Sequence, residues 1–146
     1  MLPPADATSQ LAAYAADAGL SGNDLLPQAI PQNDGVENII KFAFNMDLSA
    51  PASNVLSNTG TSGLPLVAVI EDSQNKKFQL KYIRRKNSGL TYTPMYSTTL
   101  DPQSYLPFYG TETVNDIDES FERVCVELPI DIADLCACFG IVKVDY

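Results

Sequence analysis

From residue 64 onward, apolar side chains recur at every second position in short runs. In the clearest run, Phe78, Leu80 and Tyr82 are separated by Gln79 and Lys81. A period of two places such side chains on one face of a β-strand, because successive strand residues point to opposite faces. The alternation therefore predicts that the later part of the chain is built from strands.

Five segments are predicted to be strands: a short apolar run at residues 64–71, and residues 78–83, 90–99, 121–128 and 136–144. Residues 72–75 suit a hairpin turn between the first two segments, and Asn87-Ser88-Gly89 forms a turn before the third. Pro94 has no backbone N–H, so its strand is expected at a sheet edge or with a bulge. Short strands at this spacing indicate an antiparallel β-sandwich.

The residues before this region follow the 3.6-residue period of helices instead. A first helix carries an apolar stripe at i, i+3, i+4 and i+7, formed by Leu11, Tyr14, Ala15 and Ala18. Asp6 or Thr8 can cap its start, and Gly19 can end it in a left-handed conformation. A second helix is expected over residues 35–45, with a shared face of Val36, Ile39, Ile40 and Ala43.

We therefore expect a mainly β chain: an antiparallel β-sandwich over residues 64–146, preceded by a small two-helix N-terminal segment over residues 1–48. Residues 49–63 are rich in Ser, Asn, Gly and Pro and are expected to form a polar linker. A chain of 146 residues, 45% of them hydrophobic, can bury a core of its own. No apolar run approaches the roughly 20 residues that span a bilayer, so membrane insertion is not expected.

The formal net charge of −9 argues against nucleic acid as a partner, since nucleic-acid binders usually carry a basic surface. Most of the basic residues nevertheless fall in one stretch: Lys76, Lys77, Lys81, Arg84, Arg85 and Lys86. We interpret this stretch as a solvated strand face and turn, with lysines guarding a sheet edge. A site for an anion or an acidic glycan is the alternative.

No catalytic site is expected, and the chain is predicted not to be an enzyme. The sequence has no His, which removes Ser–His and Cys–His nucleophiles and the commonest zinc ligand. Asp116, Asp118 and Glu119 cluster as glycosidase carboxylates can, but a solvated loop explains them. Asp131 and Asp134 are interpreted as turn and cap residues, with a calcium-binding loop as the alternative.

The three cysteines, Cys125, Cys136 and Cys138, are too few for a disulfide scaffold. Cys136 and Cys138 point the same way in a strand, so a bond between them would be strained. Cys125 can bond to either of them if their strands are neighbours. Buried, reduced thiols are the simpler interpretation.

Aromatic residues concentrate between positions 92 and 109: Tyr92, Tyr96, Tyr105, Phe108 and Tyr109. They are expected to cover the sandwich core and its edge. Because exposed tyrosine rings stack on sugars and form strong contacts with proteins, a protein interface or a glycan site is the alternative.

Several segments together resemble a known arrangement. Residues 11–24 contain LAAY and GLSGND, residues 33–47 read NDGVENIIKFAFNMD, and strand-like sequences follow at 78–86, 90–93 and 139–144. This order is similar to a C-terminal helix–loop–helix plus β-sandwich domain of large exported proteins from Verrucomicrobia, Planctomycetes and Lentisphaerae. There, a dockerin-like or thrombospondin-type-3-like calcium loop precedes the sandwich. The resemblance covers most of the chain and implies a terminal module of an exported protein.

The calcium loop of such a domain can be compared residue by residue. A twelve-residue loop presents ligands at positions 1, 3, 5, 7, 9 and 12, with Gly at position 6. With Gly35 at position 6, the ligand positions hold Ile30, Gln32, Asp34, Val36, Asn38 and Lys41. Ile30 offers no side-chain oxygen, and Lys41 puts a cation where a bidentate carboxylate is needed. We therefore expect the loop shape to persist without calcium, and we expect no cofactor.

The leading hypothesis is a non-catalytic structural or interaction module of a secreted or cell-surface bacterial protein, which mediates anchoring or assembly. It would bind protein partners, or copies of itself, through a sheet edge or the tyrosine-rich surface. One alternative is a carbohydrate-binding module. Another is a self-assembling subunit of an extracellular filament or shell, joined by an N-terminal arm donated to the next subunit.

Overall fold

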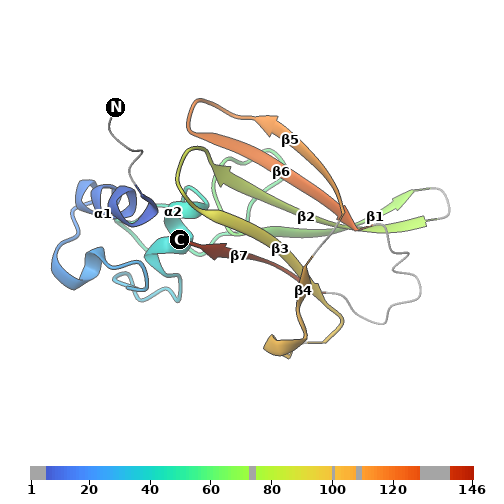
Figure 1. The fold of residues 1–146 in the computed structure, drawn as a ribbon, viewed down its shortest axis with the longest axis horizontal. Coiled ribbons are helices and arrows are strands. Elements are labelled where there is room, and N and C mark those ends of the chain that lie inside the picture. Colours follow the sequence, from blue (N-terminus) through green and yellow to red (C-terminus); the bar gives the residue numbers. More distant parts are fainter. Residues whose placement is uncertain (1–5, 73–74, 100, 108–109, 129–138) are drawn as a thin grey trace.

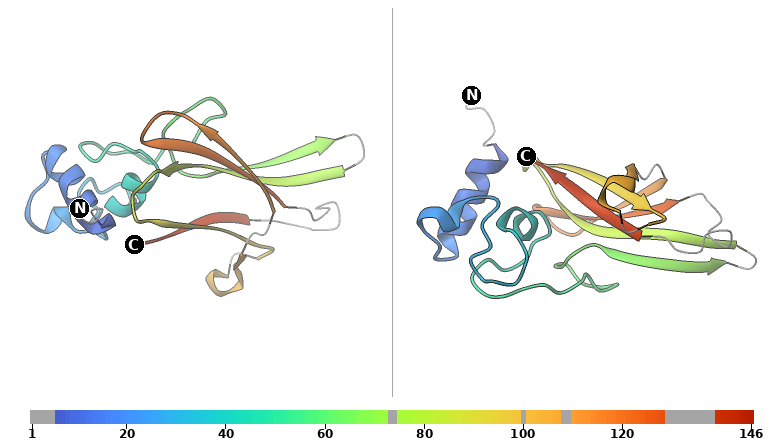
Figure 2. Two further views of the ribbon diagram at one scale, coloured as in Figure 1. Left: turned by 45° about the horizontal axis from the view of Figure 1, so that its top comes forward. Right: turned by 90° about the horizontal axis from the view of Figure 1, so that it is seen from below.

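The computed structural model describes residues 6–72, 75–99, 101–107, 110–128 and 139–146. Its strands form two antiparallel sheets that face each other, and two short α-helices lie at one end of them (Figure 1, Figure 2). The prediction of a mainly β sandwich preceded by a two-helix segment is therefore confirmed.

The larger sheet has the strand order β1-β2-β6-β5, and the smaller sheet has the order β4-β3-β7. The larger sheet consists of β1 (Leu66–Asp72), β2 (Asn75–Arg85), β6 (Phe121–Leu128) and β5 (Thr111–Asp116). The smaller sheet consists of β4 (Leu106–Pro107), β3 (Thr91–Ser97) and β7 (Phe139–Asp145). A short 3-10 helix, η2 (Pro102–Ser104), precedes β4. All neighbouring strands are antiparallel.

The central strand β2 shows the alternation that its sequence predicts. Phe78, Leu80 and Tyr82 are buried between the sheets, together with Val124 and Val126 of β6. These side chains form the main core, because the register of β2 with β6 places them on the same face of the sheet.

Residues 49–63, expected to be a polar linker, are part of the fold. Leu56 is buried against Ile83 and Phe121 on the outer face of the larger sheet. The guanidinium of Arg123 donates to the C=O groups of Asn58 (2.8 Å) and Gly60. The segment therefore covers the outer face of β2 at Ile83, where the strand is buried on both sides.

The first helix, α1 (Ala7–Asp17), has the predicted ends. The Asp6 carboxylate accepts a hydrogen bond from the Ser9 N–H (2.7 Å), which caps the N-terminus. At the other end Gly19 has φ +90°, and the Leu20 N–H donates to the Ala15 C=O (3.1 Å). A 3-10 turn, η1 (Gly22–Leu25), follows.

The second helix, α2 (Asn38–Ala43), is shorter than the predicted range of 35–45. Gly35 has φ +78° and Asn45 has φ +59°, and neither conformation can continue a right-handed helix. The predicted stripe is retained over these six residues, since Ile39 and Ala43 are buried.

The helical segment and the sandwich share side-chain contacts at their junction. Phe44 and Met46 belong to the same core cluster as the strands. The Arg85 guanidinium lies over the rings of Phe42 (4.0 Å) and Phe121 (4.5 Å), which come from the two parts. Its Nε donates to the Phe42 C=O (2.9 Å). One side chain thus ties α2 to both β2 and β6.

The strands of the smaller sheet refine two expectations. β3 lies between β7 and β4, and Pro94 pairs with Val142 of β7 in a continuous register. The residues that follow Pro107 on the β4 side of Pro94 lie outside the described residues. β7 begins at Phe139, and the predicted strand residues before it lie outside the described residues.

Candidate functional site

Strand β1 lies at the margin of the larger sheet and presents an unpaired backbone edge. All seven of its residues pair with β2, from Leu66 with Lys81 to Asp72 with Asn75, without a bulge. Among the described residues, β1 has no second strand partner. Its outward N–H and C=O groups therefore form a row that another strand can pair with. This row, over Leu66–Asp72, is named the β1 edge.

Over Leu66–Ile70 the side chains of the β1 edge are apolar, and the acidic residues Glu71 and Asp72 follow them. Val69 is 55% exposed, Val67 38% and Ile70 37%. Val69 pairs with Phe78, so Val67 and Val69 lie on the inner face of the sheet, whereas Ile70 pairs with Lys77 on the outer face. Val67 lies beside Gly140 of β7 at the margin of the smaller sheet, and Val69 is the more exposed of the two valines. The β1–β2 hairpin projects away from the helices (Figure 1).

The other free edges are better protected against pairing. Glu112 and Asp116 of β5 flank its single apolar residue, Val114. β7 carries Lys143 and Asp145, and β4 is two residues long. Charged side chains and short strands are common means of blocking a sheet edge. β1 has two charged residues of its own, Glu71 and Asp72, but both lie at its hairpin end. In the described part of the chain, Leu66–Ile70 is thus the longest uncharged run on a sheet edge and the one most open to an added strand.

Sequence reasoning predicted the β1 strand but not its position. Consecutive apolar residues such as those at 66–70 indicate a strand buried on both faces as readily as an edge strand. The available signal was the sequence of β2, where Lys77 and Lys81 alternate with the core residues. Lysines on the neighbouring strand keep the outer face polar, and that favours a position near a sheet margin.

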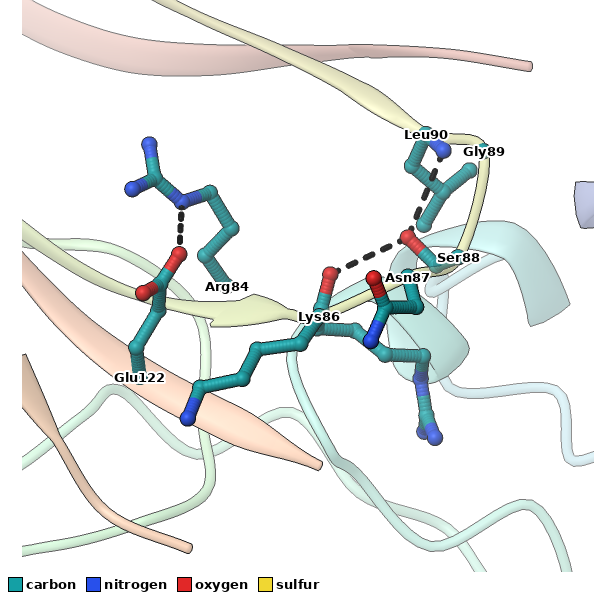
Figure 3. Close-up of a pocket in the computed structure, with 8 residues that line it drawn as sticks. Arg84, Lys86, Asn87, Ser88, Gly89, Leu90 and Glu122 are labelled. Carbon is teal, nitrogen blue, oxygen red and sulfur yellow. Dashed lines mark hydrogen bonds and ion pairs between the residues drawn. The ribbon is translucent and has the colours of Figure 1, made fainter. Parts of the chain in front are cut away.

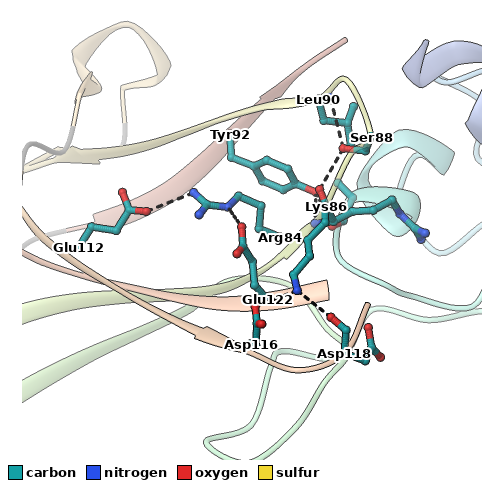
Figure 4. A network of polar contacts seen from close by, with 11 residues as sticks. Arg84, Lys86, Ser88, Leu90, Tyr92, Glu112, Asp116, Asp118 and Glu122 are labelled. Atoms are coloured by element: carbon teal, nitrogen blue, oxygen red, sulfur yellow. Dashed lines mark hydrogen bonds and ion pairs between the residues drawn. The ribbon is translucent and has the colours of Figure 1, made fainter. Parts of the chain in front are cut away.

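The basic residues at the end of β2 are paired with acidic residues (Figure 4). Arg84 Nε donates to Glu122 Oε1 (2.6 Å), and Arg84 Nη1 lies 3.2 Å from Glu112 Oε1. Lys86 Nζ lies 2.8 Å from Asp116 Oδ1. Each of these two positive charges is therefore offset by a carboxylate.

A cavity of about 410 Å³ opens at the turn after β2, lined by Glu122 and residues 84–90 (Figure 3). The Ser88 hydroxyl donates to the Arg85 C=O (3.1 Å) and accepts from the Leu90 N–H (3.3 Å), which fixes the turn. Figure 3 shows the guanidinium of Arg84 turned toward Glu122. Because Arg84 and Lys86 are paired with acids and the Arg85 guanidinium lies on aromatic rings, the geometry gives little support to an anion site.

Two of the five aromatic residues considered for a binding surface pack against the core. The ring of Tyr92 stacks on Tyr82, with 5.8 Å between centroids, and its hydroxyl donates to the Ala43 C=O (2.7 Å). The same hydroxyl accepts from the Arg85 N–H (3.0 Å). Burial raises the pKa of Tyr92 to about 12. Tyr96 also packs against the core, so these two rings do not form an open platform.

Of the other three, Tyr105 is half-buried beside β4, and Phe108 and Tyr109 lie outside the described residues. A cavity of about 430 Å³ lies nearby, lined by residues of β3, β4, β5 and β6. The described residues of this aromatic group are not gathered on one surface.

The calcium-type loop is occupied by a buried ion pair. Lys41 Nζ lies 2.5 Å from Asp34 Oδ2, and the two side chains are 1% and 6% exposed. The Asp34 carboxylate also accepts from the N–H groups of Val36 (3.0 Å) and Ala52 (2.9 Å), while Lys41 donates to the Ala50 C=O (3.3 Å). These residues do not fit calcium, because an ammonium group holds the carboxylate oxygen that the metal would need.

The remaining positions of this loop have other partners. Asn38 Nδ2 donates to the C=O groups of Asp24 (2.6 Å) and Leu26 (3.0 Å). Gln32 donates to the Leu48 C=O (3.0 Å), and Ile30 is partly exposed. The structure therefore brings together Asp34 and Lys41, and the other side chains serve to fold the loop.

The acidic cluster before β6 serves a turn. Asp118 Oδ1 accepts from the N–H groups of Ser120 (2.8 Å) and Phe121 (2.9 Å), and Glu119 is exposed. Cys125 is a free thiol, and burial raises its pKa. Outside the described residues lie Asp131, Asp134, Cys136 and Cys138.

In the part of the chain that the structure describes, no group of three or more His, Cys, Asp or Glu side chains is placed to hold a metal ion. That part also contains no helix long and apolar enough to cross a membrane. Comparison with known protein families, curated proteins and solved structures finds no match for the chain.

Proposed function

We propose that this chain is a non-catalytic interaction module, which serves anchoring or assembly by accepting an extended partner strand at the β1 edge. The observation that carries this proposal is the outward backbone of Leu66–Asp72, which has no second strand partner among the described residues, together with the exposure of Val67, Val69 and Ile70. An unprotected apolar edge is costly to keep, because it invites unwanted pairing. A binding role gives a reason for it.

Strand addition suits this edge physically. Main-chain hydrogen bonds supply affinity in such complexes, and alternate side chains supply specificity. Here Val67 and Val69 would contact a partner side chain on the inner face, and Ile70 would contact one on the outer face. The preferred partner is therefore an uncharged extended segment with β-branched side chains on both faces.

The absence of catalysis is part of the proposal. It is supported by a sequence without His and by the engagement of Asp116 and Asp118 in an ion pair and a turn. The location, secreted or at the cell surface, is proposed on the resemblance of the helix–loop–helix and strand sequences to exported proteins.

The test is the binding of a synthetic peptide of alternating valine and threonine, with a lysine at each end. Its addition should shift the backbone NMR resonances of Leu66–Asp72 and slow their amide exchange. Val69→Lys should weaken peptide binding at least tenfold, because a lysine ammonium would have to be desolvated against the added strand.

Val114→Lys is the matched control, since Val114 is also an exposed valine (42%) of the larger sheet but lies on β5, at the opposite margin. This variant should bind the peptide like the natural chain. If the peptide leaves the β1 resonances unchanged, or if both variants lose binding equally, the proposal fails.

A further inference from the structure

We infer that the partner strand at the β1 edge is the β1 strand of a second copy of this chain, paired antiparallel about a two-fold axis at Ala68. The inference rests on the proposed function, since it names the partner of the same site. The two larger sheets would then form one continuous sheet across a closed dimer.

The register follows from the symmetry. A two-fold axis through Ala68, perpendicular to the sheet, places each residue opposite the residue at the mirrored position of the partner. Val67 then faces the partner's Val69, and Leu66 faces the partner's Ile70. Every exposed apolar side chain of the edge therefore meets another apolar side chain.

The same axis keeps the faces of the sheets aligned. Val67 and Val69 lie on the inner face in both copies, so the four valines form one cluster beside the smaller sheets, where Val69 is otherwise 55% exposed. Leu66 and Ile70 lie on the outer face, opposite Lys81 and Lys77 of their own β2 strands. The aliphatic stems of these lysines can flank the new apolar row while the ammonium groups stay in water.

Charge distinguishes this arrangement from the other strand pairings that the larger sheet allows. Leu66–Ile70 contains no charged residue, so no like charges face each other across the dimer axis. A β5 strand paired with itself about Val114 would place Glu112 opposite the partner's Asp116. That contact would bring two carboxylates together.

A head-to-tail contact between β1 and the partner's β5 is also less favourable. Two antiparallel registers keep the inner faces of the two sheets on the same side and pair both Val67 and Val69 with β5. In each of them, one valine lies opposite Val114 and the other lies opposite the partner's Glu112 or the partner's Asp116. Such contacts would also repeat without closing and would form an open filament. The self-pairing of β1 avoids both problems.

The contact is short. With the axis at Ala68, the five residues Leu66–Ile70 of the two copies pair and span roughly 17 Å, so the buried area falls at the low end of specific interfaces. We therefore expect a reversible dimer that forms as the concentration of chain rises.

The first test is sedimentation equilibrium over a range of chain concentrations. The natural chain and Val114→Lys, which changes only β5, should reach twice the monomer mass. Val69→Lys should remain monomeric over the same range. A natural chain that stays monomeric overturns the inference. So does a loss of association in Val114→Lys equal to that in Val69→Lys, because this result indicates head-to-tail contacts.

The second test fixes the register by cysteine crosslinking in a chain whose native cysteines are replaced by serine. Opposite residues of an antiparallel pair are about 4.5–5.5 Å apart at Cα, within the range of a disulfide. Ala68→Cys should form a covalent dimer on oxidation, and Thr113→Cys on β5 should not. Absence of the Ala68→Cys crosslink overturns the two-fold register.

The outcomes separate the inference from the proposed function. If the synthetic peptide binds β1 while the chain stays monomeric, the β1 edge has another partner and only the inference fails. If neither the peptide nor a second copy binds, both fail.

Discussion

The buried pair of Lys41 and Asp34 holds the loop around Gly35 with one ion pair. The Lys41 ammonium donates to the Ala50 C=O and the Asp34 carboxylate accepts from the Ala52 N–H, so the pair ties the loop to the segment that follows α2. The sequence allowed the mismatch of Lys41 with a calcium loop to be predicted from its position relative to Gly35. It did not predict the partners, because Ala50 and Ala52 contribute backbone groups that any residue carries.

Lys41→Met should destabilise the fold by about 3–5 kcal/mol, because it leaves the Asp34 carboxylate buried without its counter-charge. Urea unfolding measures this change. Lys77→Met is the control, since the Lys77–Glu127 pair is longer (3.7 Å) and largely exposed. Lys77→Met should lower the free energy of unfolding by less than about 1 kcal/mol. Equal effects of the two substitutions would contradict the assigned role of Lys41.

Stability should also depend on pH through Asp34. Burial raises the pKa of Asp34, but the Lys41 ammonium and the N–H groups of Ala52 and Val36 lower it more, to about 2. The folded-state pKa is thus below the ordinary value of 3.8, so this stabilisation is present above about pH 4 and is lost as the pH falls toward 2. Asp34→Asn should flatten the pH dependence of unfolding in this window, and an unchanged dependence would argue against the assignment.

At the scale of elements, the sequence predicted those strands and helix ends that depend on residues close together in the chain. The alternation at 78–82 and the cap at Asp6 are local features, and both were confirmed. β5 was not predicted, because Thr111–Asp116 has one apolar residue and is exposed on both faces. The order of strands depends on long-range pairing, so the free edge of β1 could not be derived from its sequence.

The segment 49–63 gives an element-scale prediction. Gly63 has φ +139°, and a Cβ there would lie 2.7 Å from the Leu56 backbone nitrogen. Gly63→Ala should therefore shift the backbone and loosen Leu56 from the outer face of the sheet. Gly19→Ala is the control, because Gly19 also has positive φ but has open space around it. This substitution should lower the free energy of unfolding by only about 1–2 kcal/mol. Thermal unfolding should show a clearly larger decrease in stability for Gly63→Ala. A loss no greater than that of Gly19→Ala would show that residues 49–63 behave as a linker.

At the scale of the whole molecule, the two ends of the sandwich differ. The helices cover one end, where Arg85 links α2 to the sheet, and the β1–β2 hairpin projects from the other (Figure 1, Figure 2). The net charge of −9 opposes contact between copies, so association at the β1 edge should strengthen with added salt. The apolar pairing of Leu66–Ile70 then acts against a repulsion between copies that added salt screens.

Amide hydrogen exchange of Leu66–Asp72 at low and high chain concentration tests the central claim most directly. The account predicts that the outward amides of β1 exchange rapidly in dilute solution and become protected as copies meet, while those of β5 do not change. Protection of all β1 amides in the dilute monomer would mean that the edge is already covered within one chain, and it would contradict the account.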